Sequence, residues 1–261
     1  TSNDHGTHMA SIAAGWTYGT AKAASIIPIQ VLDANGEGTT ASVLCGMEKL
    51  LQDGIDYNAA NAPKKIKSIV NLSLGVDGRS DALDKAVHDM TEVGYTVVIA
   101  AGDHDGNACF YSPYDPSAIT VGALKDHEEG YNDKTGTSNY GECIDIWAPG
   151  EDIVGASNAG EYESVSKSGT SVAAAFVAGA ASLFFETIWS EQYPAEEFSE
   201  RVKEIIINKA EINILEDIGH NSVNKIIQTT VSRCSLNSHC APGLTCLTRD
   251  GMCADLSKPL Y

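Results

Sequence analysis

The sequence predicts an α/β fold: a mainly parallel sheet with helices on both faces, followed by a small disulfide-rich module at the C-terminus. Three observations support this. Apolar runs bounded by glycine alternate with longer helical patterns, which is typical of βαβ units. The runs are almost continuously hydrophobic, as expected of strands that are buried on both faces. Four of the seven cysteines crowd the C-terminal end of the chain.

The elements follow one another in the order that such a fold requires. A first helix is expected from a cap at Asn3 or Asp4 through His5 to Gly15. The later strands are predicted at Ile26–Leu32, Ile69–Leu74, Thr96–Ala101, Ile119–Leu124 and Ile144–Ala148. The later helices are predicted at Ala41–Leu51, Asp81–Val93, Ser171–Phe185 and Phe198–Ile207.

The chain divides into a main domain over residues 1–230 and a cysteine-rich module over residues 231–261. The module is poor in apolar residues and rich in turn signals, so disulfides are expected to hold it together. An even cluster of cysteines at short spacing indicates an oxidising compartment, and four cysteines allow three pairings. The members of this cluster are Cys234, Cys240, Cys246 and Cys253.

Composition excludes several classes of function. The chain has 261 residues, of which 43% are hydrophobic, enough for one sizeable core. Its 35 acidic and 17 basic side chains give a formal charge of −18, which argues against nucleic acid and anionic lipid surfaces as partners. No stretch approaches the roughly 18 apolar residues that a membrane-spanning helix needs.

Two segments carry residues that could take part in catalysis. The first places His5 in the first turn of its helix, where the helix dipole disfavours imidazolium and keeps the ring available as a base. The second, Ser168–Gly179, places Ser171 at the start of a helix that is small and apolar on all sides, where backbone N–H groups favour a developing anion. Each segment alone also fits a structural role, as a surface histidine or a capping serine.

Together, HGTHMA near the start and SGTSVA with VAG much later resemble the subtilisin-like serine proteases. In detail the chain is most similar to the proteinase K branch, which implies a disulfide between Cys109 and Cys143. The resemblance covers about residues 3–228. It continues in the family's order through the motifs at Val31–Asp33, Asn71–Gly75, Ala100–Gly102, Tyr111–Pro113, Ile119–Ala123, Ser138–Gly141 and Ala148–Gly150.

The resemblance implies hydrolysis of peptide bonds by a secreted serine endopeptidase. Ser171 would attack the peptide carbonyl, with His5 as general base and then general acid. The backbone N–H of Ser171 would contribute to the oxyanion hole. The substrate, a peptide or protein, would lie as an added strand between two segments. These segments are Ser73, Leu74 and Gly75 on one side and Ala100, Ala101 and Gly102 on the other. A propeptide is a further partner that the resemblance allows.

The chain departs from the family pattern at two places. The family's catalytic Asp lies several dozen residues before the histidine, whereas only Thr1–Asp4 precede His5, so we expect the sequence to be incomplete at its N-terminus. Asp103 stands where the family has an oxyanion-hole Asn, and an ionised carboxylate has no proton to donate. Burial would favour a protonated Asp103, so we expect activity that is weak or favours acidic pH.

Two alternatives compete with the protease interpretation. A catalytically impaired relative that binds peptides or serves as a structural protein also fits both departures. An esterase of the α/β-hydrolase type does not fit, because the G-x-S-x-G motif is absent and the histidine precedes the serine.

No cofactor is predicted for this chain. The family often binds calcium, and carboxylates are available at Asp33, Asp115 and Asp145, but none of them matches a calcium-loop pattern, so no metal site is assigned. Cys45, in the middle of a predicted helix, is expected to be a buried free thiol.

Overall fold

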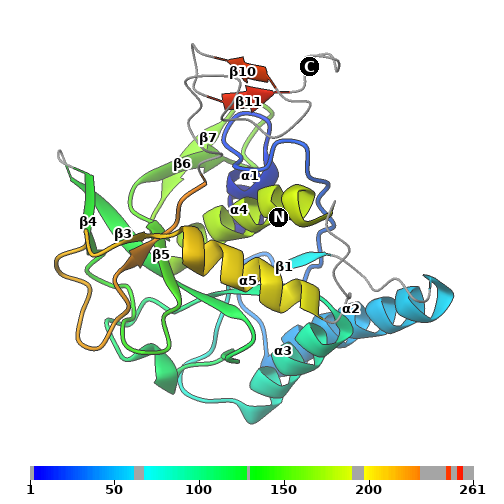
Figure 1. The fold of residues 1–261 in the computed structure, drawn as a ribbon. Coiled ribbons are helices and arrows are strands. Elements are labelled where there is room, and N and C mark those ends of the chain that lie inside the picture. Colours follow the sequence, from blue (N-terminus) through cyan, green and yellow to red (C-terminus); the bar gives the residue numbers. More distant parts are fainter. Residues whose placement is uncertain are drawn as a thin grey trace. The chain divides into compact units, whose positions relative to one another are not determined.

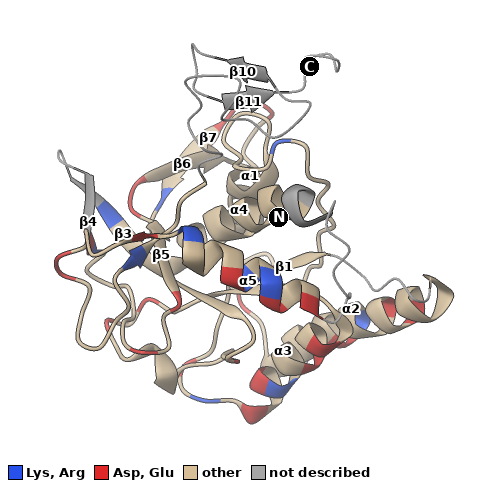
Figure 2. Cartoon of the chain, in the orientation of Figure 1, with Lys and Arg blue, Asp and Glu red and all other residues tan. Residues whose placement is uncertain are grey.

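The computed structural model describes residues 3–61, 68–127, 130–189, 197–229, 245–247 and 252–254. The chain divides into two compact units, residues 1–227 and residues 228–261, and each is described by itself. Within the described residues, no helix is long and apolar enough to cross a membrane. Acidic residues are spread over helices α2, α3 and α5 and over the loops (Figure 2).

The first unit is built on one twisted sheet whose central strands are parallel (Figure 1). The strand order is β1-β2-β3-β5-β9-β8, with β4 paired to β3. Strands β1, β2, β3, β5 and β9 are parallel, and β8 and β4 run antiparallel to their neighbours. The bounds are β1 Ile69–Leu72, β2 Thr96–Ala100, β3 Ile119–His127, β4 Gly130–Lys134, β5 Ile146–Pro149, β8 Glu211–Ile212 and β9 Lys225–Ile226.

Helices cover both faces of this sheet. Val98 in β2 packs into a core with α4 (Thr170–Trp189) and α5 (Phe198–Lys209). Its neighbours Val97 and Ile99 pack into a separate core with α2 (Thr40–Asn61) and α3 (Asp81–Val93). All three valine and isoleucine side chains are fully buried, as successive residues of a strand covered on both faces must be.

Helix α1 (His5–Ala14) packs against α4 at very short range. A Cβ atom on Gly179 would lie 2.5 Å from the Ala13 carbonyl oxygen, so only glycine permits this approach. A hairpin of β6 (Ile153–Ala156) and β7 (Ser164–Lys167) lies beside α1 and leads directly into α4. The fold thereby places the first turns of α1 and α4 in one region of the molecule.

The predicted α/β class with a mainly parallel sheet is confirmed, with differences in two of the predicted elements. Helix α2 continues beyond its predicted end at Leu51 to Asn61. Ile26–Leu32 is not a strand, and Ile26 and Ile27 are 48% and 83% exposed. A strand requires a neighbour for its backbone groups, and no described strand pairs with this segment. Its last residues, Val31 and Leu32, still pack against the α2–α3 core.

The cysteines of the first unit follow the prediction in part. Cys109, in the short 3₁₀ helix η1 (Ala108–Phe110), is bridged to Cys143, and their Cα atoms are 5.3 Å apart. Cys45 is a free thiol as expected, but the prediction that it is buried was wrong, because its position in α2 is exposed.

The second unit contains two described strands, β10 (Thr245–Leu247) and β11 (Met252–Ala254), which pair antiparallel with Cys246 opposite Cys253. Cys234 and Cys240 lie outside the described residues, so the pairing of the four cysteines stays a prediction.

Candidate active site

The start of α1 holds His5 beside the β6–β7 hairpin. The Asn3 carboxamide oxygen accepts a hydrogen bond of 2.8 Å from the His5 backbone N–H. The Asp4 carboxylate is paired with the Lys167 ammonium of β7 at 2.7 Å and is hydrogen-bonded by the Ser157 hydroxyl. The Asp4 carboxylate therefore has its partners in the hairpin.

His5 is in an environment that favours its neutral form. Burial lowers the pKa of the His5 imidazole below its usual value, and the positive charge of Lys167 lowers it further. The carboxylates of Asp4 and Asp103 act in the opposite direction but are smaller influences. Within the described part of the chain, no side chain holds the His5 ring by a hydrogen bond. A neutral imidazole at neutral pH is the state that a general base needs.

Ser171 lies in the first turn of α4 and is tied to the strand end after β1. The Ser171 hydroxyl donates to the Ser73 carbonyl oxygen at 3.2 Å, and the Ser73 hydroxyl donates to the Ser171 carbonyl oxygen at 2.7 Å. Asn71 in turn donates from its amide to the Ser73 hydroxyl at 2.9 Å. In this conformation the Ser171 proton is directed to Ser73 and not to His5, so a hydrogen bond between His5 and Ser171 stays a prediction.

Asp103 caps the N-terminus of α4, next to Ser171. Its carboxylate accepts hydrogen bonds from the Thr170 backbone N–H at 2.8 Å and from the Thr170 hydroxyl at 3.3 Å. Acceptance of an N–H at a helix N-terminus is the stabilising role of an ionised carboxylate. Asp103 is exposed, so the expected burial of this side chain was wrong. The assignment of position 103 to the oxyanion site stays a prediction.

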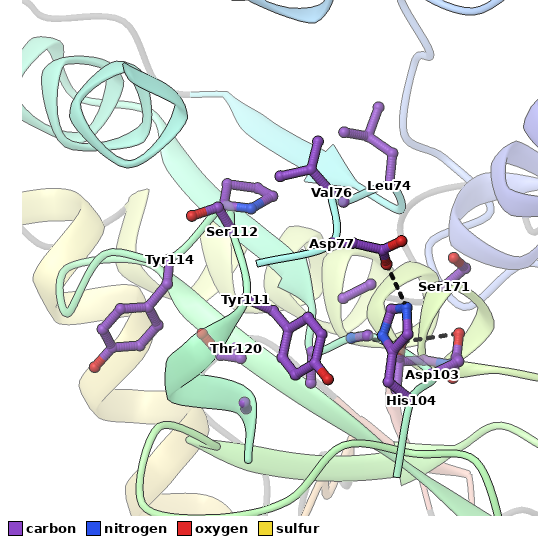
Figure 3. Close-up of a pocket in the computed structure, with 17 residues that line it drawn as sticks. Leu74, Val76, Asp77, Asp103, His104, Tyr111, Ser112, Tyr114, Thr120 and Ser171 are labelled. Carbon is purple, nitrogen blue, oxygen red and sulfur yellow. Dashed lines mark hydrogen bonds and ion pairs between the residues drawn. The ribbon is translucent and has the colours of Figure 1, made fainter. Parts of the chain in front are cut away.

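A cavity of about 260 Å³ extends from Ser171 between the two strand ends (Figure 3). One wall follows β1 and the other follows β2, so the carboxyl ends of adjacent parallel strands form the cavity. Seven of the nine predicted site residues line it: Leu74, Gly75, Ala100, Ala101, Gly102, Asp103 and Ser171. Ser73 is hydrogen-bonded to Ser171 but does not line the cavity. His5 is also not among the lining residues.

Buried hydrogen bonds fix the shape of the second wall. Gly102 adopts a φ of +97°, and a side chain there would collide with the Asn139 amide. Asn139 is fully buried, donates to the Ala101 carbonyl oxygen at 2.7 Å, and accepts from the backbone N–H groups of His104 and Gly106 at 3.0 Å. The Ser138–Gly141 motif thus has a positioning role that the sequence did not reveal.

The sequence also did not reveal the polar residues at the cavity edge. Asp77 and His104 line the cavity, and their side chains are joined by a contact of 2.7 Å between the Asp77 carboxylate and His104 Nε2. Tyr111, whose motif had no assigned role, stacks on the His104 ring with a centroid separation of 4.6 Å. Only their place after two adjacent parallel strands could have indicated these residues.

The described residues do not fit a calcium site. Asp33 accepts backbone N–H groups of its own turn, Asp115 is bonded to Ser117 and paired with His88, and Asp145 is paired with Lys203. In the part of the chain that the structure describes, no three His, Cys, Asp or Glu side chains converge as metal ligands would.

The fold and the arrangement of these segments define the subtilisin-like α/β class. A solved structure titled as a cold adapted subtilisin-like serine proteinase is similar over 88% of this chain and 76% of its own, with a TM-score of 0.74 and 31% identity. The chain belongs to the subtilase family, whose model matches residues 1–234.

Curated relatives carry names from the same family. An "Extracellular serine proteinase" of Thermus sp. (strain Rt41A) is 37% identical over 228 residues, which is 87% of this chain and 50% of the relative. A "Subtilisin-like protease 3" of Pseudogymnoascus destructans is 42% identical over 181 residues, 69% of this chain and 42% of the relative. The chain thus spans about half the length of the curated relatives it matches. The closer assignment to the proteinase K branch stays a prediction.

Proposed function

We propose that this chain is part of a secreted subtilisin-like serine endopeptidase in which Ser171 is the nucleophile and His5 the general base. The observation that supports this best is the position of Ser171. It heads a buried helix and borders a cavity whose two walls are the predicted substrate-binding segments. A peptide added as a strand along either wall would present a carbonyl carbon at the mouth of this cavity.

The proposed reaction uses groups with matching chemistry. His5 would take the Ser171 proton as Oγ bonds to the carbonyl carbon, and would then give that proton to the leaving amine as the C–N bond breaks. A water molecule would release the acyl group by the same steps. The low pKa of His5 keeps the ring in its accepting form at neutral pH. For this transfer, the Ser171 hydroxyl must turn from Ser73 toward His5.

The oxyanion site is the part of the proposed mechanism that departs from the family pattern. The Ser171 backbone N–H would donate to the oxyanion, but Asp103 supplies a charge of the wrong sign nearby. The natural substrates are peptides or proteins, and no cofactor is proposed. Secretion is supported by the Thermus relative, whose printed name calls it extracellular.

The test is covalent labelling of the full-length protein with a fluorophosphonate probe. We expect one adduct on Ser171, found by peptide mass spectrometry, and no adduct in Ser171→Ala. Ser73→Ala serves as a second control, because it removes the hydroxyl that bonds the Ser171 backbone carbonyl and keeps both the nucleophile and the Ser73 carbonyl that accepts from it. A folded wild-type protein that takes up no label would instead be the peptide-binding relative with an unassembled nucleophile.

A further inference from the structure

The cavity has a charged link across its two walls. Asp77 lies on the segment that follows β1, and His104 lies on the segment that follows β2. Their side chains meet at 2.7 Å, and both residues line the cavity. In the view of Figure 3 the link lies between Ser171 and the two tyrosines, Tyr111 and Tyr114. A substrate side chain that enters the cavity therefore encounters this pair.

Contacts with the surrounding structure fix the backbone next to Asp77 and the position of His104. Val76 forms a backbone bridge to Ser112, with its N–H 2.9 Å from the Ser112 carbonyl oxygen, which fixes the residue before Asp77. The His104 backbone is bonded to Asn139, and its ring is stacked on Tyr111 at an interplanar angle of 9°. The backbone before Asp77 and the ring of His104 are thus both fixed, and the Asp77 side chain reaches His104 from a defined position.

The charge of the cavity lining has one sign. Two carboxylates, Asp77 and Asp103, face it, and no lysine or arginine is among its lining residues. Arg79, two residues after Asp77, is paired with Asp84, and Lys167, which precedes α4, is paired with Asp4. The rest of the lining is uncharged and consists mostly of small, aliphatic and aromatic residues, which suits the alkyl stem of a long side chain.

Asp77 is the carboxylate that is free to change partner. Its side chain is 89% exposed, and its partner is a single histidine. Asp103, by contrast, is held by both the backbone N–H and the hydroxyl of Thr170. An incoming ammonium or guanidinium group could replace His104 on Asp77, whereas an incoming carboxylate would meet repulsion from both aspartates.

We propose that the Asp77–His104 link determines substrate specificity, so that the cavity favours a lysine or arginine side chain and discriminates against aspartate and glutamate. The inference rests on the proposed peptidase function, because the cavity would receive the side chain that precedes the scissile bond. Asp77 acts by charge, and His104 holds the carboxylate in position when the cavity is empty.

The test compares three peptide substrates that differ only in the residue before the scissile bond, which is Lys, Leu or Glu. The full-length enzyme is expected to show kcat/KM in the order Lys, Leu, Glu. In Asp77→Asn the Lys-to-Glu ratio should fall about two- to fivefold, the size of one exposed ion pair. About 1 M salt should lower the wild-type ratio in the same direction, because it screens the charge.

Two further variants separate charge at the cavity from charge elsewhere. Asp81→Asn removes the same charge from an exposed position in α3 that does not line the cavity, and it should leave the ratio unchanged. His104→Phe keeps a ring on Tyr111 and frees Asp77, so the ratio should stay at the wild-type value or rise.

Failure of this inference is distinguishable from failure of the proposed function. If Ser171 takes up the fluorophosphonate and all three peptides are cleaved, but Asp77→Asn keeps the wild-type ratio, the specificity inference is overturned and the proposed function stands. If neither labelling nor cleavage occurs, the proposed function is overturned and this inference with it.

Discussion

The packed length of helix α4 and its first turn illustrate two kinds of constraint. Along its length, Ala173, Ala174 and Val177 are fully buried against the sheet and against α5. At its first turn the neighbours are polar: Asp103 bonds Thr170, and Ser73 bonds Ser171. The packed length fixes where the helix lies, and the polar end determines what chemistry is available there. Substitutions in the packed part should therefore change stability, and substitutions at the polar end should change activity or its pH dependence.

The largest effect is expected from the packed part. Phe198 is fully buried in the same core and meets the Phe185 ring edge-on at a centroid distance of 4.7 Å. Phe198→Ala should lower the free energy of unfolding by about 3–5 kcal/mol, because it removes buried area and leaves a cavity. Urea unfolding followed by circular dichroism measures this change.

The matched control is Phe110→Ala, at a ring that is 67% exposed, where a change within about 0.5 kcal/mol is expected. Equal losses for the two variants would contradict the division between packed and polar regions.

At the polar end, Asp103→Asn should raise activity. Asn retains an oxygen that can accept the Thr170 N–H, and it adds an amide that can donate to an oxyanion. A single such donor is worth about 3–4 kcal/mol, so kcat/KM at neutral pH should rise by at least about tenfold. The unfolding free energy should change little, since the acceptor at the helix terminus is kept.

Asp105→Asn, two residues further on, makes the same change of charge at a residue that is paired with Lys134 and does not line the cavity. It should leave kcat/KM unchanged. An Asp103→Asn protein with wild-type activity would show that the oxyanion site does not include position 103.

His8 is a buried ionisable group in α1, so its titration should affect stability and not activity. It is fully buried, its Nε2 lies 3.0 Å from the Ile153 carbonyl oxygen, and burial lowers the pKa of its imidazole. The unfolded chain therefore binds this proton at a higher pH than the folded chain does. Stability should be fully present above about pH 6.5 and should fall as the pH decreases through the lower folded pKa.

The measurement is the unfolding free energy in urea between neutral and mildly acidic pH. His8→Gln removes one titrating group, so it should be less stable at neutral pH but should show a shallower dependence on acid. His5, whose pKa is also lowered, contributes to the slope that remains. The interpretation fails if the variant and the wild type lose stability with the same slope.

The spacing of apolar residues predicted the buried strands and helices well, because a buried element needs apolar residues at regular positions. The central strands and the helices α3, α4 and α5 lie close to the predicted ranges. Ile26–Leu32 has the same apolar character as those strands but lacks a neighbour, and pairing is a property of the fold and not of the segment. The same reason explains why Asp77 and His104 could not be predicted. They are far apart in sequence and meet only because β1 and β2 are adjacent.

The smallest effect is expected from the ion pair between Asp4 and Lys167, which adjoins His5 without being part of the packed core. The Lys167 charge lowers the pKa of His5, and the Asp4 charge raises it. Lys167→Met should therefore shift the acidic limb of the kcat/KM profile to higher pH, and Asp4→Asn should shift it to lower pH. Both shifts should shrink in high salt, because both residues are partly exposed. Opposite shifts from the two variants would show that charge acts on His5, whereas equal losses of activity at every pH would show that the pair only holds α1 against the hairpin.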